Sequence, residues 1–259
     1  MQLDEKFQKL IEIMETLRSE KGCPWDRVQT HDTLKRYLLE ETYELIEAIE
    51  KKDINGIKEE LGDLLLQIVF HSQIAREEGN FDINDVIDTI SKKMIGRHPH
   101  VFGNAEFKTS EEVLNQWDER KKEEGKLCSS ILEGIPPTLT ALLRAYKIQS
   151  RVARVGFDWE NTDGVIDKIK EELNEVEEAI KSGRKNETEE EIGDLLFSIV
   201  NLARFFKIDP ETALRKTNRK FEERFKKLEE LAREKGKNLK EMNLSEMDNL
   251  WEDIKNKEL

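Results

Sequence analysis

The chain contains the same segment twice, and this duplication limits its fold more than any other feature of the sequence. Residues 40–49 (EETYELIEAI) align without gaps with residues 171–180 (EELNEVEEAI), and six of the ten positions are identical. Residues 60–69 (ELGDLLLQIV) align with residues 191–200 (EIGDLLFSIV), with seven identities in ten. Both offsets are 131 (171 − 40 and 191 − 60), so the spacer between the blocks has one length. Such repetition indicates two structural modules of one type.

Weaker matches extend the two copies outward at slightly different offsets. They are Gly22–Trp25 with Gly156–Trp159, Lys93 and Arg97 with Lys220 and Arg224, and Trp117 and Lys121 with Trp251 and Lys255. We therefore predict an N-terminal module at residues 1–125 and a C-terminal module at residues 137–259. The segment GKLCSSILEGIPP between them contains Gly, Ser and a Pro-Pro pair, so we predict a linker at residues 126–136.

Apolar residues recur at helical spacing through both copies, and no β-strand pattern competes, although 38% of the residues are charged. In the first copy we predict two long helices at residues 32–51 and 54–78, joined at Asp53–Gly56. The second copy joins its equivalents at Ser182-Gly183. Connections this short place the two helices of a pair side by side and antiparallel.

Each copy is expected to contain one helix before this pair and one after it. Asp4 and Thr138 are the predicted N-caps of the preceding helices. The later helices follow Asn84 and Pro210, and His98-Pro99-His100 is expected to interrupt the one in the first copy. The predicted fold is therefore all-α, with two tandem four-helix-bundle modules.

Two aspartates lie where a solvated acidic residue is not expected. Asp63 directly precedes Leu64-Leu65-Leu66, and Asp194 directly precedes Leu195-Leu196-Phe197. A helix with so many apolar residues in its next turn is mostly buried, so each aspartate is expected at the edge of the core. An unpaired buried carboxylate is costly in free energy, so such a residue needs a cation or strong hydrogen-bond donors.

The spacing of the neighbouring acidic residues predicts a cluster in each copy. Glu41 with Glu44, and Glu60 with Asp63, are three residues apart, so each pair lies on one helix face. The short turn brings the two faces together, and four carboxylates are expected to converge. These sets are Glu41, Glu44, Glu60 and Asp63 in the first copy, and Glu172, Glu175, Glu191 and Asp194 in the second. Clustered carboxylates repel one another unless protons or a metal ion neutralise them.

Ligands that are all oxygen favour Mg²⁺, with Mn²⁺ as a substitute, over zinc. A di-iron bundle needs Glu-x-x-His on two helices, and no Glu in this chain has His three residues later. The two cysteines, Cys23 and Cys128, offer neither zinc-site spacing nor a disulfide framework. A salt-bridged seam between helices remains the structural alternative to a metal site.

The overall charge bears on the partners. The formal net charge is 43 − 56 = −13, which is unsuited to binding nucleic acid or an anionic membrane by bulk electrostatics. The longest apolar run is too short to span a bilayer, and the first ten residues, MQLDEKFQKL, contain no apolar signal core. We expect a cytoplasmic protein without nucleic-acid or membrane partners, and the sequence identifies no protein partner.

The acidic pattern resembles that of a known family. It is Glu-Glu-x-x-Glu at residues 40–44 with Glu-x-x-Asp at residues 60–63, and it recurs at residues 171–175 and 191–194. Together with the tandem layout and the segments GCPWD (22–26) and GRHPHVFG (96–103), it closely resembles the MazG family of nucleoside triphosphate pyrophosphohydrolases. The resemblance covers nearly the whole chain.

The resemblance implies the all-α NTP pyrophosphatase fold, assembled as a homodimer. It implies hydrolysis of NTP to NMP and diphosphate, dependent on Mg²⁺, tolerant of the base and carried mainly by the C-terminal copy. The four acids of each copy would be metal ligands. Residues implied to contact the nucleotide are Lys168, Glu190, Lys220, Arg224, Trp251 and Lys255, with Lys93, Arg97, Trp117 and Lys121 at related positions of the first copy.

Physical arguments agree with several of these roles, and simpler alternatives stay open. Lys220 and Arg224 are four residues apart and share a helix face, and Trp251 could stack on any base. A charged pair on a helix is nevertheless often solvated, and a tryptophan often fills a core. Glu171 and Glu40 adjoin the expected ligands and are candidates for orienting the attacking water.

The copies differ beside their acidic residues, because Lys168 and Lys170 of the second stand where the first has Tyr37 and Leu39. The second copy is thus better supplied with cations. Two alternative functions remain: a narrower house-cleaning enzyme that prefers one nucleotide, and a non-catalytic helical dimer that binds regulatory ligands or proteins.

Overall fold

The computed structural model describes residues 3–103, 109 and 130–257. All regular secondary structure in these residues is helical, which confirms the predicted all-α class. The chain divides into two compact units, Met1–Gly125 (unit 1) and Lys126–Leu259 (unit 2). The predicted linker at 126–136 lies partly outside the described residues, and its boundaries stay predictions.

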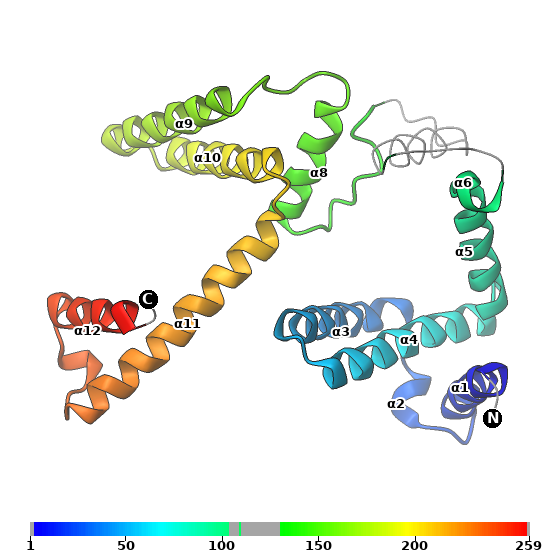
Figure 1. Cartoon of the computed structure of the whole chain (residues 1–259). Coiled ribbons are helices and arrows are strands. Elements are labelled where there is room, and N and C mark those ends of the chain that lie inside the picture. The colour runs from blue at the N-terminus through cyan, green and yellow to red at the C-terminus, as the bar shows by residue number, and fades with distance from the viewer. Residues whose placement is uncertain (1–2, 104–108, 110–129, 258–259) are drawn as a thin grey trace. The chain divides into compact units, whose positions relative to one another are not determined.

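Unit 1 is built around a pair of long antiparallel helices (Figure 1). Its elements are α1 (Leu3–Arg18), α2 (Pro24–Arg27), α3 (His31–Lys51), α4 (Ile54–Glu77), α5 (Ile83–Arg97) and α6 (Pro99–Phe102). The core forms where α1 and α3 pack on α4, and its buried residues are Met14, Leu34, Val69, Phe70 and Ile74. The predicted metal ligands lie in the other part of the pair, in the C-terminal half of α3 and the N-terminal half of α4.

Local capping chemistry explains the bounds of the α3–α4 pair. Thr30 caps α3 through a reciprocal bond with Thr33, and Asp53 accepts from the backbone N–H groups of Asn55 and Gly56 at the start of α4. Lys52 ends α3 in the left-handed region, with φ 57°. The predicted helices at 32–51 and 54–78 therefore agree with the structure to within one residue at each end.

Unit 2 repeats the pair and adds a helix beyond the four predicted. Its elements are α8 (Ala141–Ala153), α9 (Thr162–Ser182), α10 (Lys185–Phe205), α11 (Pro210–Glu234), the 3₁₀ helix η1 (Leu239–Glu241) and α12 (Leu244–Lys257). Gly183, with φ 69°, turns the chain from α9 towards α10. In Figure 1, α12 folds back along the C-terminal half of α11, and their buried residues are Leu228, Ala232, Met242, Leu250 and Ile254.

Two predicted N-caps are wrong. α8 begins after Thr140 rather than Thr138, because the chain between them forms a turn before the helix. Asp4 lies inside the first turn of α1, where its charge still interacts favourably with the helix dipole. Both positions depend on where the first turn closes, which apolar spacing defines only to within a few residues.

The helix after the central pair differs in length between the units. α5 ends at Arg97 because Pro99 lacks a backbone N–H and restricts His98, whose φ and ψ are −121° and 59°. The expected interruption at His98-Pro99-His100 is thus confirmed, and a separate short helix, α6, follows it. α11 has no proline after Pro210 and continues for 25 residues. Its added length is what α12 packs against. Among the described residues, no helix has the length and apolar character needed to cross a membrane.

Candidate metal centre

In unit 2, three carboxylates from two helices converge at the α9–α10 pair. Glu172 and Glu175 lie one turn apart on α9, and Glu191 lies on the facing side of α10. Each offers an oxygen atom, and these atoms lie within 4.8 Å of one another. We call these three residues the unit 2 triad. Asp194, the fourth predicted ligand, is exposed on α10 and lies outside this group.

Unit 1 forms the corresponding triad from a different choice among equivalent positions. Glu41 of α3 and Glu60 and Asp63 of α4 offer oxygen atoms that lie within 4.8 Å of one another. We call these three residues the unit 1 triad. Glu44, the equivalent of Glu175, is exposed and lies outside the triad, although its charge acts on Glu41 and Glu60. Each unit therefore brings together three of the four predicted ligands.

Burial and the repulsion between neighbouring carboxylates raise the pKa of some glutamates in each triad. Burial, followed by the charge of Asp63, raises the pKa of Glu41, and burial, followed by the charge of Glu44, raises the pKa of Glu60. In unit 2, burial and then the charge of Glu172 raise the pKa of Glu175. In each case the charged form is disfavoured, which is the condition that a bound cation relieves.

A lysine lies directly against the unit 2 triad. Lys168 Nζ lies 2.7 Å from Glu172 Oε1 and 2.8 Å from Glu171 Oε1, since all three share one face of α9. These hydrogen bonds raise the pKa of Lys168, with the contact to Glu171 contributing most. Glu172 is only 4% exposed, so its carboxylate is poorly solvated and depends on such a partner.

The equivalent position in unit 1 is a neutral aromatic residue. Tyr37 accepts a hydrogen bond at its hydroxyl from Arg36, whose guanidinium lies 4.4 Å from the ring centroid. The ring of Trp25 meets Tyr37 edge-on, with centroids 5.6 Å apart. The charged groups that shift the pKa of Glu41 are all carboxylates. The guanidinium of Arg36 thus contacts Tyr37.

The donor set of both triads fits a hard divalent cation. All six side chains supply carboxylate oxygens, and two helices present them together, as Mg²⁺ or Mn²⁺ sites require. Nothing in either triad is a sulfur or imidazole ligand that would favour zinc. The residues present are therefore compatible with the predicted metal.

Three further predicted residues lie beside the triads. Glu40 and Glu171 are exposed and immediately precede Glu41 and Glu172, and Glu171 accepts a hydrogen bond from Lys168. Glu190 is exposed on α10, next to Glu191. Their positions leave them open to water, as the predicted roles in orienting water or contacting substrate require.

The remaining predicted nucleotide contacts of unit 2 lie on other helices. Lys220 and Arg224 are on α11, and Trp251 and Lys255 are on α12. The ring of Trp251 lies 5.1 Å from that of Phe221 and packs against the α11–α12 core, while Lys255 forms a 2.7 Å ion pair with Glu252. These packing contacts of Trp251 are the ones expected of a tryptophan that fills a core, which is the simpler alternative to stacking on a base.

In unit 1 the related positions are only partly described. Lys93 is exposed on α5, and Arg97 is buried at the end of that helix. Trp117 and Lys121 lie outside the described residues. The structure therefore leaves their predicted substrate contacts as predictions.

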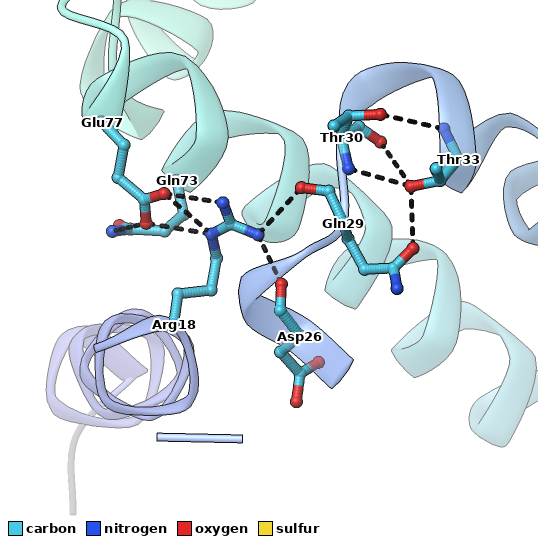
Figure 2. Close-up of polar contacts among 7 residues, drawn as sticks. All are labelled: Arg18, Asp26, Gln29, Thr30, Thr33, Gln73 and Glu77. Carbon is cyan, nitrogen blue, oxygen red and sulfur yellow. Dashed lines mark hydrogen bonds and ion pairs between the residues drawn. The ribbon is translucent and has the colours of Figure 1, made fainter. Parts of the chain in front are cut away.

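Sequence reasoning missed the network that holds the start of α3 in place (Figure 2). Arg18 Nη2 lies 2.7 Å from Glu77 Oε2, and its Nη1 donates to the backbone oxygens of Asp26 and Gln29. One guanidinium thus joins α1, α4, α2 and the loop that leads from α2 into α3, the helix that carries Glu41. No spacing rule could reveal it, because Arg18 and Glu77 are 59 residues apart.

In unit 2 a different ion pair holds the corresponding loop, which precedes α9. Arg204 near the end of α10 forms an ion pair with Asp158, which precedes α9, and also donates to Asn201. The side chain of Arg204 is largely buried. Both units therefore use a buried arginine to anchor the loop before the helix with the first ligands, although the arginines come from different helices.

Comparison with known proteins shows that the chain is similar to a family model and to individual proteins. A family model described as the MazG nucleotide pyrophosphohydrolase domain matches residues 29–102 and residues 161–229, which include both triads. The chain is 54% identical over 250 residues to the nucleoside triphosphate pyrophosphohydrolase/pyrophosphatase MazG of Thermotoga maritima, covering 96% of this chain and 95% of that protein. It is 45% identical over 259 residues to the nucleoside triphosphate pyrophosphohydrolase of Escherichia coli (strain K12), covering 98% of each chain.

Proposed function

The chain belongs to the MazG family and is a nucleoside triphosphate pyrophosphohydrolase, and we propose that its reaction depends on Mg²⁺ and is carried mainly by unit 2. The reaction is NTP + H₂O → NMP + diphosphate. The single observation that supports the choice of unit 2 is Lys168, which places a cation against a carboxylate triad. A site for a highly anionic substrate needs such positive charge beside its metal ligands.

The residues of unit 2 divide into three roles in this proposal. Glu172, Glu175 and Glu191 would hold the metal ion. When bound, Mg²⁺ supplies neutralisation of phosphate charge and a lowered pKa of coordinated water. Lys168 would bind and orient the triphosphate as a point charge. The triphosphate is thereby held in one orientation, which removes part of the entropic barrier to attack by water.

Glu171 is the proposed group that orients water. Its carboxylate is exposed, adjoins Glu172 and accepts a hydrogen bond from Lys168. When Lys168 turns to a phosphate, the Glu171 oxygen becomes free to accept the proton of the attacking water. Glu40 has the same place in unit 1, without a lysine beside it.

Product analysis tests both the reaction and its specificity. The full chain is incubated with each ribo- and deoxynucleoside triphosphate and Mg²⁺, and the products are separated by ion exchange. NMP and diphosphate from many bases support the broad pyrophosphohydrolase. Turnover of one base alone would support the narrower house-cleaning alternative, and inorganic phosphate with NDP would contradict the proposed reaction. The relatives give no support to a non-catalytic role.

We also propose that the protein is a homodimer. Leu61, Leu65 and Ile68 of α4 are 53%, 37% and 46% exposed, and they form one stripe at helical spacing. The equivalent residues of α10, Ile192, Leu196 and Ile199, are 45%, 49% and 46% exposed. Apolar stripes at the same three positions of both units are what a second copy of the chain would cover.

Sedimentation of the full chain tests the dimer. Leu65→Glu with Leu196→Glu should convert it to a monomer, because a charge would be buried at each stripe. Leu244→Glu is the matched control, since Leu244 is 79% exposed on α12 and lies on neither stripe. A wild-type chain that sediments as a monomer at micromolar concentration would contradict the proposal. A cytoplasmic location stays a prediction from the sequence.

A further inference from the structure

Lys168 occupies a carboxylate oxygen of the unit 2 triad that a metal ion would also use. Lys168 Nζ and the oxygen Glu172 Oε1 are 2.7 Å apart, a charge-assisted hydrogen bond at a carboxylate that is 4% exposed. The Glu172 carboxylate is poorly solvated and the Lys168 side chain is 36% exposed, so water screens the pair only in part. A divalent cation that binds Glu172 must therefore displace the ammonium group or share the carboxylate with it.

The unit 1 triad has no equivalent competitor at this position. Tyr37 replaces Lys168 one helical turn before Glu41, and its hydroxyl is occupied by Arg36. The charges that act on Glu41 are those of Asp63, Glu44, Glu60 and Glu40. Within the part of the chain that the structure describes, no lysine or arginine forms an ion pair with the unit 1 triad, whereas Lys168 partly neutralises the unit 2 triad.

We propose that Lys168 makes divalent-cation binding at the unit 2 triad depend on a bound polyphosphate, whereas the unit 1 triad, with Tyr37, binds the cation by itself. This inference rests on the metal-dependent function proposed above. A triphosphate offers Lys168 another anion, so its arrival frees the Glu172 oxygen for the cation. By thermodynamic linkage, the cation then strengthens triphosphate binding by the same factor.

The two triads then differ in how cation binding depends on the nucleotide. In unit 2, cation and triphosphate bind together, and neither occupies the site fully without the other. In unit 1, the cation is retained whether or not a nucleotide is present. Because a hydrogen bond between charged groups must be exchanged at unit 2, the expected effect of Lys168 on cation affinity is about tenfold.

The test measures cation binding to the full chain without nucleotide, using Mn²⁺ by electron paramagnetic resonance and Mg²⁺ by calorimetry. A Glu41→Gln/Asp63→Asn background isolates the unit 2 triad, and a Glu172→Gln/Glu191→Gln background isolates the unit 1 triad. In the first, Lys168→Gln should tighten binding about tenfold. In the second, Tyr37→Lys should weaken it by a similar factor, about tenfold.

Lys170→Gln is the matched control. Lys170 is on the same helix and pairs with Asp167 at 2.9 Å, so its loss changes the net charge equally without touching the triad. Lys168→Arg should keep the wild-type cation affinity, and circular dichroism with thermal unfolding verifies that each variant folds. Equal affinities for wild type, Lys168→Gln and Lys170→Gln would overturn the inference, as would equal tightening by both glutamine variants.

A second measurement follows the coupling itself. A non-hydrolysable triphosphate analogue should tighten cation binding at the unit 2 triad in the wild type, and by about tenfold less in Lys168→Gln. An equal effect of the analogue in both chains would also overturn the inference. Failure of the proposed function is a separate outcome, because wild-type chains that bind the cation as described but hydrolyse no NTP would contradict the function alone.

Discussion

The two triads are built on equivalent pairs of helices, α3–α4 and α9–α10, yet they differ in which residues they gather and in which charged groups lie beside them. Unit 1 takes one ligand from α3 and two from α4, whereas unit 2 takes two from α9 and one from α10. Unit 2 has Lys168 against its triad and unit 1 has Tyr37. A repeated motif therefore defines the candidate ligands, and the neighbouring residues decide the charge of the site.

The largest expected difference between the units is in catalysis. Glu172→Ala should lower kcat for NTP hydrolysis by about 10³-fold or more, because several kcal/mol of charge stabilisation would be lost. Glu41→Ala should leave most of the activity, since unit 2 is proposed to carry the reaction. Steady-state assays of diphosphate release measure both. Equal losses would show that the two triads act together, and loss only in Glu41→Ala would reverse the assignment.

The loop anchors give the next largest contrast. The Arg18 side chain is 7% exposed and serves Glu77 and two backbone oxygens, so Arg18→Ala should destabilise unit 1 by about 2–4 kcal/mol. Arg204→Ala removes fewer partners and should destabilise unit 2 by about 1–2 kcal/mol. Urea unfolding followed by circular dichroism measures both, with separate transitions fitted where the units unfold independently. A larger effect for Arg204→Ala would contradict this ranking.

The smallest effect concerns pH and the crowded carboxylates. The pKa of Glu41 is raised on folding, so the folded state binds a proton more readily than the unfolded state. The ionised residue therefore lowers stability at pH 7, and this penalty disappears as the pH falls below the ordinary glutamate pKa. Glu41→Gln, measured in a chelator, should raise Tm by about 1–3 °C at pH 7.

The comparison between units sharpens this last prediction. The gain from Glu41→Gln should vanish near pH 3, well below the ordinary glutamate pKa, where Glu41 is protonated in both the folded and the unfolded state. Glu172→Gln should give no gain at pH 7, because it gives up the ion pair with Lys168. Differential scanning calorimetry at both pH values measures these shifts. A rise in Tm for both variants would mean that Lys168 does not stabilise the unit 2 triad.

The sequence alone determined the features that depend on local chemistry. The duplication, the antiparallel pairs, the bounds of α3 and α4, the break at Pro99 and the eight candidate ligands all follow from periodicity, capping residues and motif spacing. The helix bounds and the break at Pro99 depend on residues close together in the chain, and the duplication is visible because two segments of the sequence match at one offset. The extra helix α12 was not predicted, and the structure shows that its apolar face packs on the C-terminal part of α11.

Only the tertiary structure decided which side chains meet. It placed three of four predicted ligands together in each unit, packed Trp251 against Phe221, and joined Arg18 to Glu77. These contacts depend on the rotation of each helix about its axis and on the packing of segments far apart in the chain. A rotation that moves one side chain out of reach leaves the helical pattern of the sequence unchanged, which is why spacing could name the candidates but not choose among them.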